Sequence, residues 1–305
     1  MHRGLRAAAA AVSVLAIAGS TGCTLSRAQA DYRSPAPLPS AGALSASATP
    51  SATPAPPPVP AGLRRLTVAG RSYLLYVPRN VARPAPLVVA LGGVGWFSPK
   101  AVADFRIQGV AGRSHAVVAY PDPVNGAWNA GACCFNATAD DIGFLSKMRA
   151  QIAKLVPLDP SHQVLIGFSN GGMLAYDAAC ADVHWSAVVV LGASLMTRCT
   201  PTHPFNITNV NGMSDNVARW NGGYARYTHT VMPPVWLLDQ EFAVAFGCGP
   251  AAKTHTTDND VVTYAGCHGG VVVRDIRVRG LRHHWPLHEI DGYDMGPVLW
   301  RLALR

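Results

Sequence analysis

Short apolar runs alternate with amphipathic stretches along most of the chain. The clearest runs are almost continuously apolar and cover residues 86–91, 116–120, 164–167 and 187–191. Such runs are typical of strands that are buried on both faces of a parallel sheet. The stretches between them predict helices at residues 100–114, 140–155 and 170–180. This alternation predicts an α/β fold in which a mostly parallel central sheet carries helices on both faces.

Weaker patterns extend the sheet on both sides of this central part. Two strand-like segments, 66–68 and 73–77, flank a turn at Gly70-Arg71, as expected for a hairpin. Further strands are predicted at residues 207–210, 261–264 and 271–278, and a closing helix is predicted at 296–304. The folded domain is therefore expected to cover residues 61–305.

The first 23 residues have the pattern of an export signal. A short basic start precedes an apolar stretch at residues 7–18, which is too short for a mature membrane-spanning helix but suits a cleaved signal. Residues 19–23 resemble a bacterial lipobox, in which a lipid is attached to the cysteine, although Ser20 replaces the usual aliphatic residue. We expect a lipoprotein-type signal that ends at Cys23. Ordinary signal cleavage nearby is the alternative.

Residues 24–60 consist mostly of Ala, Pro, Ser and Thr. A segment with so few large apolar residues cannot bury enough surface to order itself, and its prolines favour an extended spacer. With a lipid on Cys23, this segment would be a disordered tether. The protein would then be extracellular or in the cell envelope, anchored to the outer face of the cell membrane.

The composition narrows the classes of partner. Of the 305 residues, 49% are hydrophobic and 14% are charged, which suits a domain with a sizeable core. The net charge is +8, but the basic residues are scattered along the chain. A nucleic-acid partner is not expected, because binding one requires a clustered basic surface.

Six cysteines remain when Cys23 is set aside, and they are Cys133, Cys134, Cys180, Cys199, Cys248 and Cys267. An even number in an exported protein predicts three disulfides. Cys180 with Cys199 and Cys248 with Cys267 are the plausible local pairs. They would leave two chain neighbours to pair with each other, an unusual arrangement, so the connectivity stays open. The spacing fits no zinc motif, and no metal is expected.

The strongest chemical signal is Gly167-Phe168-Ser169-Asn170-Gly171, a GxSxG sequence. It directly follows an apolar strand and directly precedes a predicted helix, which is the context of a nucleophile elbow. In such a turn the serine oxygen is exposed at the C-terminal edge of the sheet. A Gly/Ser-rich turn without chemistry is the alternative reading.

A serine nucleophile needs a base and an orienting acid. Where the serine lies in a nucleophile elbow, both follow it in the chain. Asp215 and His283 each follow a predicted strand by five residues. Other acids and bases stand nearby and compete on position alone, namely Asp239, Asp258, Asp260, Asp275, His268, His284 and His288.

Several stretches resemble the polyhydroxybutyrate depolymerase and feruloyl esterase group of α/β-hydrolases, which includes actinobacterial esterase lipoproteins. They include residues 86–91, 119–122 and 140–145, the GFSNGGM sequence at 167–173, and residues 211–215 and 283–286. The resemblance implies the α/β-hydrolase fold and a serine esterase without a cofactor. The family's His-x-Trp-Pro pattern places the base at His283, and its Gly-x-x-Asp loop places the acid at Asp215. The expected partner is an ester, polymeric or small, and the expected state is a monomer.

The chain departs from the family in the loop after the third strand, where Leu91-Gly92-Gly93 replaces Leu-His-Gly. The oxyanion is expected to bind the backbone N–H groups of Asn170 and Val94, with Gly93 as the alternative to Val94. Trp128 and Trp285 are expected to face the substrate, with structural packing as the alternative. Two other functions stay open: an envelope acyltransferase that uses the same triad, and a non-catalytic binding lipoprotein.

Overall fold

The computed structural model describes residues 60–135, 138–226, 228–286 and 300. The expected signal with Cys23, the expected tether up to residue 59 and the closing helix apart from Trp300 lie outside the described residues. Trp300 is buried and its Nε1 donates a hydrogen bond to the Ser114 hydroxyl at 2.6 Å. This contact holds Trp300 against the domain.

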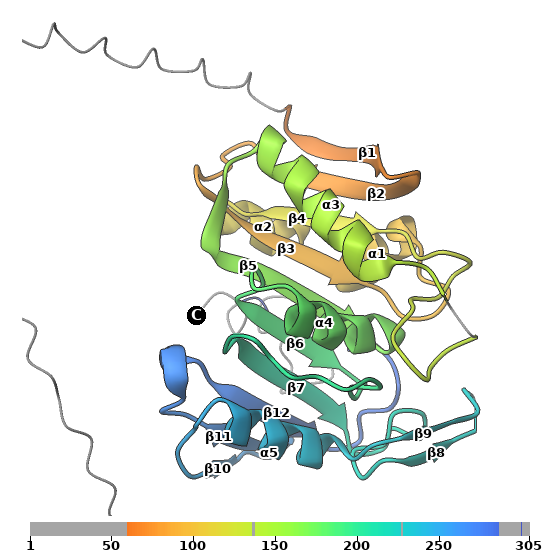
Figure 1. The fold of residues 1–305 in the computed structure, drawn as a ribbon, viewed down its shortest axis with the longest axis vertical. Coiled ribbons are helices and arrows are strands. Elements are labelled where there is room, and N and C mark those ends of the chain that lie inside the picture. Colours follow the sequence, from red (N-terminus) through yellow and green to blue (C-terminus); the bar gives the residue numbers. More distant parts are fainter. Residues whose placement is uncertain (1–59, 136–137, 227, 287–299, 301–305) are drawn as a thin grey trace, which may run out of the picture. The chain divides into compact units, whose positions relative to one another are not determined.

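Within the described residues, ten strands form one sheet in the order β1-β2-β4-β3-β5-β6-β7-β12-β11-β10 (Figure 1). The strands are β1 (Gly62–Val68), β2 (Arg71–Val77), β3 (Ala85–Leu91), β4 (Val117–Pro121), β5 (Leu158–Phe168), β6 (Ala187–Leu191), β7 (Asn206–Gly212), β10 (Ala252–His255), β11 (Asn259–Tyr264) and β12 (Val273–Val278). The six central strands from β4 to β12 pair in parallel. The pairs outside them are antiparallel. The predicted mostly parallel sheet is confirmed.

Helices cover both faces of this sheet. They are α1 (Ser98–Phe105), α2 (Gln108–Arg113), α3 (Asp141–Leu155), α4 (Asn170–Ala181) and α5 (Val235–Ala245). Apolar side chains of α3, α4 and α5 pack on one face, and those of α1 and α2 pack on the other. Among the described residues, no helix combines the length and the apolarity needed to cross a bilayer.

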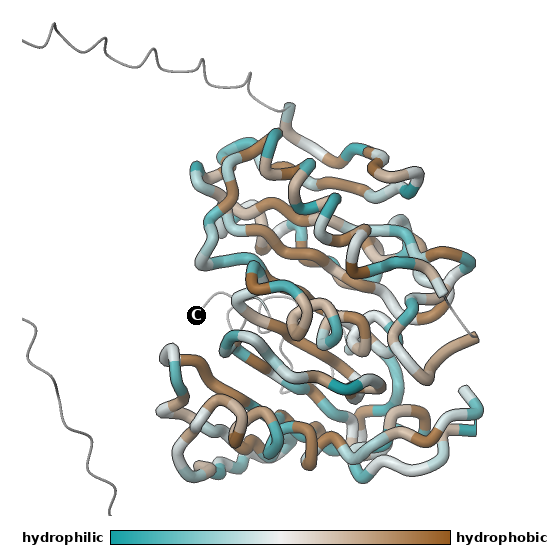
Figure 2. The backbone as a smooth tube through the Cα atoms, in the orientation of Figure 1, coloured by the Kyte–Doolittle hydropathy of each residue, from teal (hydrophilic) through white to brown (hydrophobic). Residues whose placement is uncertain are grey.

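The two apolar layers explain why the central strands are continuously apolar. In β3, Val89 belongs to the core on the α3–α4 side and Val88 to the core on the α1–α2 side, because successive side chains of a strand point to opposite faces. Figure 2 shows the resulting hydrophobic strands in the middle of the domain. The positions that predicted buried strands are therefore those that make the two cores.

The structure differs from the sequence-based expectation in several elements. The helix expected at residues 100–114 is two helices, because Arg106 adopts a left-handed conformation with φ 52° that ends α1. Helix α5, strand β10 and a hairpin of β8 (Gly223–Ala225) and β9 (Thr230–Met232) were not expected. The α5 sequence VWLLDQEFAVA is apolar on most sides, so its periodicity does not distinguish a helix from a strand.

Three disulfides join the six cysteines of the domain. They link Cys180 to Cys199, Cys248 to Cys267 and Cys133 to Cys134. Both local pairs expected from the sequence are therefore present, together with the bond between chain neighbours that the sequence left open. The first of these bonds ties the end of α4 to the loop that follows β6.

Candidate active site

Ser169 lies in the sharp turn between β5 and α4. Its backbone has φ 53° and ψ −125°, a conformation that residues other than glycine rarely adopt. The flanking glycines make the turn possible. A Cβ atom on Gly167 would lie 2.5 Å from the carbonyl oxygen of Gly171, and one on Gly171 would lie 2.2 Å from that of Leu91. The strand, turn and helix are those that a nucleophile elbow requires.

Hydrogen bonds join Ser169, His283 and Asp215 in one line. His283 Nε2 lies 2.9 Å from Ser169 Oγ, and His283 Nδ1 lies 2.7 Å from Asp215 Oδ2. Because an ionised carboxylate can only accept, Nδ1 carries the ring proton and Nε2 is free to accept the proton of the serine hydroxyl. The three residues follow the C-terminal ends of β5, β7 and β12, which meet at one edge of the parallel part of the sheet.

The carboxylate of Asp215 is held by its own loop. Its Oδ1 accepts hydrogen bonds from the backbone N–H groups of Val217 and Ala218, each at 2.8 Å, while Oδ2 faces His283. The side chain is only 1% exposed. Both carboxylate oxygens of Asp215 therefore take part in hydrogen bonds, which fix the orientation of the carboxylate toward His283.

A cavity of about 240 Å³ opens in front of Ser169 and His283. Its other lining residues are Gly93, Val94, Trp96, Phe168, Val217 and Thr228. Most of these side chains are apolar, and among the described residues His283 is the only ionisable group in the lining. Trp96, Val217 and Thr228 were not expected from the sequence. Val217 follows Asp215 by two residues, and that spacing could have indicated it.

The loop after β3 lies against the nucleophile. A Cβ atom on Gly93 would lie 3.3 Å from Ser169 Cβ, and both Gly93 and Val94 line the cavity. The loop is held in place by hydrogen bonds from Trp96 N to Gly93 O and from Gly95 N to Gly126 O. Asn170 follows Ser169 and is fully buried. The residues expected to bind an oxyanion thus flank Ser169.

Comparison with known proteins finds esterases. The chain is 32% identical over 188 residues to Feruloyl esterase B of Piromyces equi, a match that covers 55% of this chain and 34% of that protein. It is 26% identical over 252 residues to Putative esterase NocK of Nocardia uniformis subsp. tsuyamanensis, which covers 73% of each. The chain thus spans about a third of the length of the first relative. No family model matches.

Solved structures show the same fold. Acetyl xylan esterase from Aspergillus awamori superposes with a TM-score of 0.56 at 16% identity, over 74% of this chain and 96% of that one. The S-formylglutathione hydrolase from Agrobacterium tumefaciens gives 0.51 at 14% identity, over 79% and 93%. The chain has the α/β-hydrolase fold. The resemblance to the esterase group of α/β-hydrolases, drawn from motifs, is confirmed by these relatives.

Trp128 is buried inside the domain, contrary to the sequence-based expectation that it faces the substrate. Its side chain is fully buried. The indole Nε1 donates to the carbonyl oxygen of Gly92 at 2.9 Å. The backbone N–H of Trp128 donates to Asn170 Oδ1, and Asn170 Nδ2 donates back to the carbonyl oxygen of Trp128. The expectation is wrong because the ring packs inside the domain, where its N–H bonds to the loop after β3, and it exposes no surface to a ligand.

Trp285 is nearly buried and lies beside the cavity that contains Ser169. It is 6% exposed and packs edge-on against Phe105 and Phe168. It also lines a second cavity of about 330 Å³. The other residues around that cavity are Trp96, Lys100, Asp104, Phe168, His283 and His284. The two cavities share the His283 ring, so Trp285 lies next to the proposed site without lining the cavity that contains Ser169.

The competing acids and bases among the described residues lie outside the hydrogen-bond line that joins Ser169, His283 and Asp215. Asp239 and Asp275 are buried and accept from Asn209 and Asn211, respectively. Asp260 pairs with Arg279 and His255 at the surface. His268 lies next to Gly247, and His284 lines only the second cavity. His288 lies outside the described residues.

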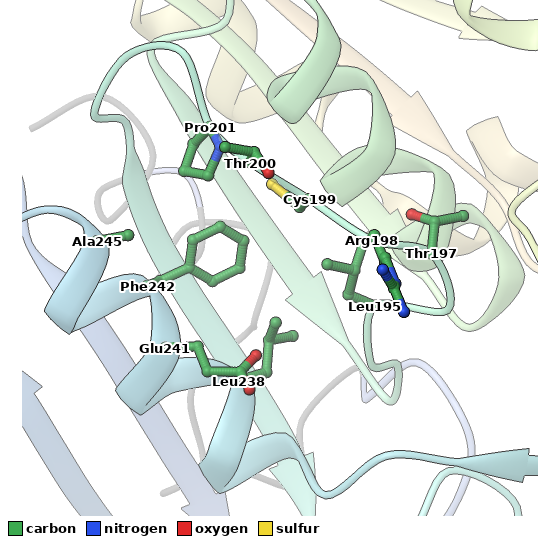
Figure 3. A pocket seen from close by; sticks show the side chains of 10 residues that line it. All are labelled: Leu195, Thr197, Arg198, Cys199, Thr200, Pro201, Leu238, Glu241, Phe242 and Ala245. Atoms are coloured by element: carbon green, nitrogen blue, oxygen red, sulfur yellow. The ribbon is translucent and has the colours of Figure 1, made fainter.

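A third cavity lies between α5 and the loop that follows β6 (Figure 3). It measures about 300 Å³, and none of Ser169, Asp215 and His283 lines it. Helix α5 contributes Leu238, Glu241, Phe242 and Ala245, and the loop contributes residues 195 and 197–201. The cavity is therefore separate from the candidate active site.

Proposed function

We propose that this α/β-hydrolase cleaves carboxylic esters by two-step acyl transfer. Ser169 is the nucleophile, His283 is the base and Asp215 orients the imidazole. The observation that carries the proposal is the continuous hydrogen-bond line from Asp215 through His283 to Ser169, which ends at a largely apolar cavity. Esterases among the relatives support the same activity.

The residues divide the chemistry as follows. His283 Nε2 accepts the proton of the Ser169 hydroxyl as its oxygen attacks the ester carbonyl, and then donates it to the leaving alcohol. The backbone N–H groups of Asn170 and Val94, or Gly93 in place of Val94, hold the oxyanion, and each such donor typically contributes about 3 kcal/mol. Water then hydrolyses the acyl-enzyme with His283 as the base.

Aromatic and acetyl esters of plant polymers are the first substrates to test. The relatives are named Feruloyl esterase B and acetyl xylan esterase, and short hydroxyalkanoate esters are a further candidate class from the family resemblance. The described lining of the cavity is mostly apolar and contains no Asp, Glu, Lys or Arg side chain, which favours an uncharged group over a charged one. We place the enzyme outside the cell because three disulfides are typical of an oxidising compartment.

The deciding experiment combines a fluorophosphonate probe with a panel of p-nitrophenyl, feruloyl and acetyl esters. Wild-type protein should be labelled at Ser169 and should hydrolyse at least one ester. Ser169→Ala should lose labelling and should lose activity by several orders of magnitude, with an unchanged circular dichroism spectrum. A folded Ser169→Ala protein that hydrolyses esters at the wild-type rate would disprove the assignment.

A further inference from the structure

A buried carboxylate outside the proposed triad connects the two ends of the loop that carries Asp215. We define the acid loop as residues 212–219, which begins at the last residue of β7 and contains both Asp215 and the cavity residue Val217. Asn211 stands directly before this loop and Trp220 directly after it. Both donate to Asp275 on the neighbouring strand β12: Asn211 Nδ2 to Oδ1 at 2.9 Å, and Trp220 Nε1 to Oδ2 at 3.0 Å.

The carboxylate at the centre of this arrangement is buried. Asp275 and Asn211 are each 1% exposed. Arg277 also donates to Asp275 Oδ2, at 2.8 Å, and its guanidinium lies 4.1 Å from the centre of the Trp220 ring. Arg277 therefore balances the charge of the Asp275 carboxylate at Oδ2, the same oxygen that accepts from Trp220. Strands β7 and β12 lie side by side, with α5 against β12 (Figure 1).

We infer that Asp275 is a positioning residue for Asp215. By bonding Asn211 and Trp220 it sets the distance between the two ends of the acid loop, and the backbone N–H groups of Val217 and Ala218 in that loop hold the Asp215 carboxylate toward His283. The inference rests on the proposed function and extends it to a residue that touches neither the substrate nor the reacting atoms. A shift of about 1 Å in a supporting residue can lower the rate about a hundredfold.

Asp275→Asn is the sharpest variant. An amide of the same shape keeps one acceptor oxygen, but its NH₂ group must then face either the Asn211 amide or the Trp220 and Arg277 donors. Either the Trp220 and Arg277 donors lose their acceptor, or the Asn211 amide has to turn over to keep its hydrogen bond, so in both cases the link between the two ends of the loop changes. We expect kcat to fall about tenfold to a hundredfold while KM changes little.

Asp239→Asn is the matched control. Asp239 is also buried, and its carboxylate accepts from Asn209, which does not border the acid loop. Burial and the nearby Asp275 carboxylate raise the pKa of Asp239 well above its usual value, so a neutral amide resembles its native form. This variant should retain the wild-type kcat. Trp220→Phe removes one donor and should lower kcat less than Asp275→Asn does. The double variant should lose no more kcat than Asp275→Asn alone, because both changes break the same hydrogen bond.

A second readout separates this inference from the proposed function. The proton in the hydrogen bond between His283 and Asp215 gives a low-field NMR resonance, and we expect Asp275→Asn to shift or broaden it while Asp239→Asn leaves it unchanged. This signal can be read even if no tested ester is hydrolysed. A folded Asp275→Asn protein with the wild-type kcat and resonance would overturn the inference, as would an equal loss in Asp239→Asn.

Discussion

Among single residues, Ser169 shows most clearly how the local sequence sets up the site. Its positive φ is unfavourable for a side chain, and the turn persists because β5, α4 and two glycines surround it. A methyl group on Gly171 would have to overlap the backbone of β3. The sequence requirement at these positions is therefore steric, whereas the requirement at Ser169 is chemical.

The two adjacent histidines test the assignment of the base. His283 Nε2 lies 2.9 Å from Ser169 Oγ, whereas His284 lines only the second cavity. We expect His283→Ala to lower kcat/KM by several orders of magnitude and His284→Ala by less than about tenfold. Steady-state hydrolysis of a p-nitrophenyl ester measures both. The reverse order of the two losses would place the base one residue later.

Among the elements, α4 and the loop that follows β6 are held together by two different contacts. The disulfide between Cys180 and Cys199 joins them covalently. The Thr197 hydroxyl donates to the Asp177 carboxylate within the same interface. Burial raises the pKa of Asp177 to about 6, against the lowering effect of that hydrogen bond. The burial of the Asp177 carboxyl therefore makes the stability of the domain depend on pH.

Asp177 should lower stability in neutral solution. Its folded pKa of about 6 exceeds the usual 3.8, so the folded state binds the proton more tightly than the unfolded state. The resulting penalty is absent below about pH 4, grows as the pH rises to about 6 and is complete above that. Asp177→Asn should therefore raise the free energy of unfolding by on the order of 2 kcal/mol at pH 8.

Urea denaturation of wild-type and Asp177→Asn protein between pH 4 and pH 8 measures this effect. The amide oxygen can still accept from Thr197, so the hydrogen bond is retained in the variant. The stability difference should vanish at pH 4. A difference that is the same at both pH values would contradict the assignment of the raised pKa.

Over the whole molecule, the parallel sheet brings distant parts of the chain together. Ser169, Asp215 and His283 are separated by up to 114 positions in sequence, yet each follows a strand that ends at the same edge. The loops at that edge also supply Gly93, Val94, Val217 and Thr228 to one cavity. Helices on both faces keep the sheet rigid, so the loops are free to differ in sequence without loss of the fold.

The attachment of the whole protein is tested at Cys23. We expect a lipid on this cysteine, because it follows an apolar segment of signal length and precedes a Pro/Ala/Ser-rich stretch that suits a tether. One acyl chain binds a membrane only marginally, whereas the several chains of a bacterial lipoprotein hold firmly. Wild-type protein should partition into detergent, and Cys23→Ser protein should be soluble or remain an unprocessed precursor.

Mass spectrometry of the mature N-terminus decides this question. A modified Cys23 would support the anchor, and an unmodified terminus downstream of it would show a freely secreted enzyme. Neither result changes the proposal for Ser169, because the described domain contains all three residues of the proposed triad.

The sequence by itself determined the features that depend on neighbouring residues. The apolar runs indicated the central strands, and the glycines around Ser169 indicated a turn between a strand and a helix. Both local disulfides joined cysteines only 19 positions apart. These features are predictable because periodicity, turn geometry and short loop closure are properties of a short stretch of chain.

Only the tertiary structure decided which side chains meet across the sheet. Trp128 is an aromatic residue in a loop, and its burial follows from contacts with Gly92 and Asn170, 36 and 42 positions away. Asp275 competed as an acid on position alone, but β12 pairs it with Asn209 of β7, and its carboxylate accepts from the side chain of Asn211, 64 positions away. Parallel strands are joined by long crossovers, so the register of one strand against another depends on the packing of the entire core, which no local pattern encodes.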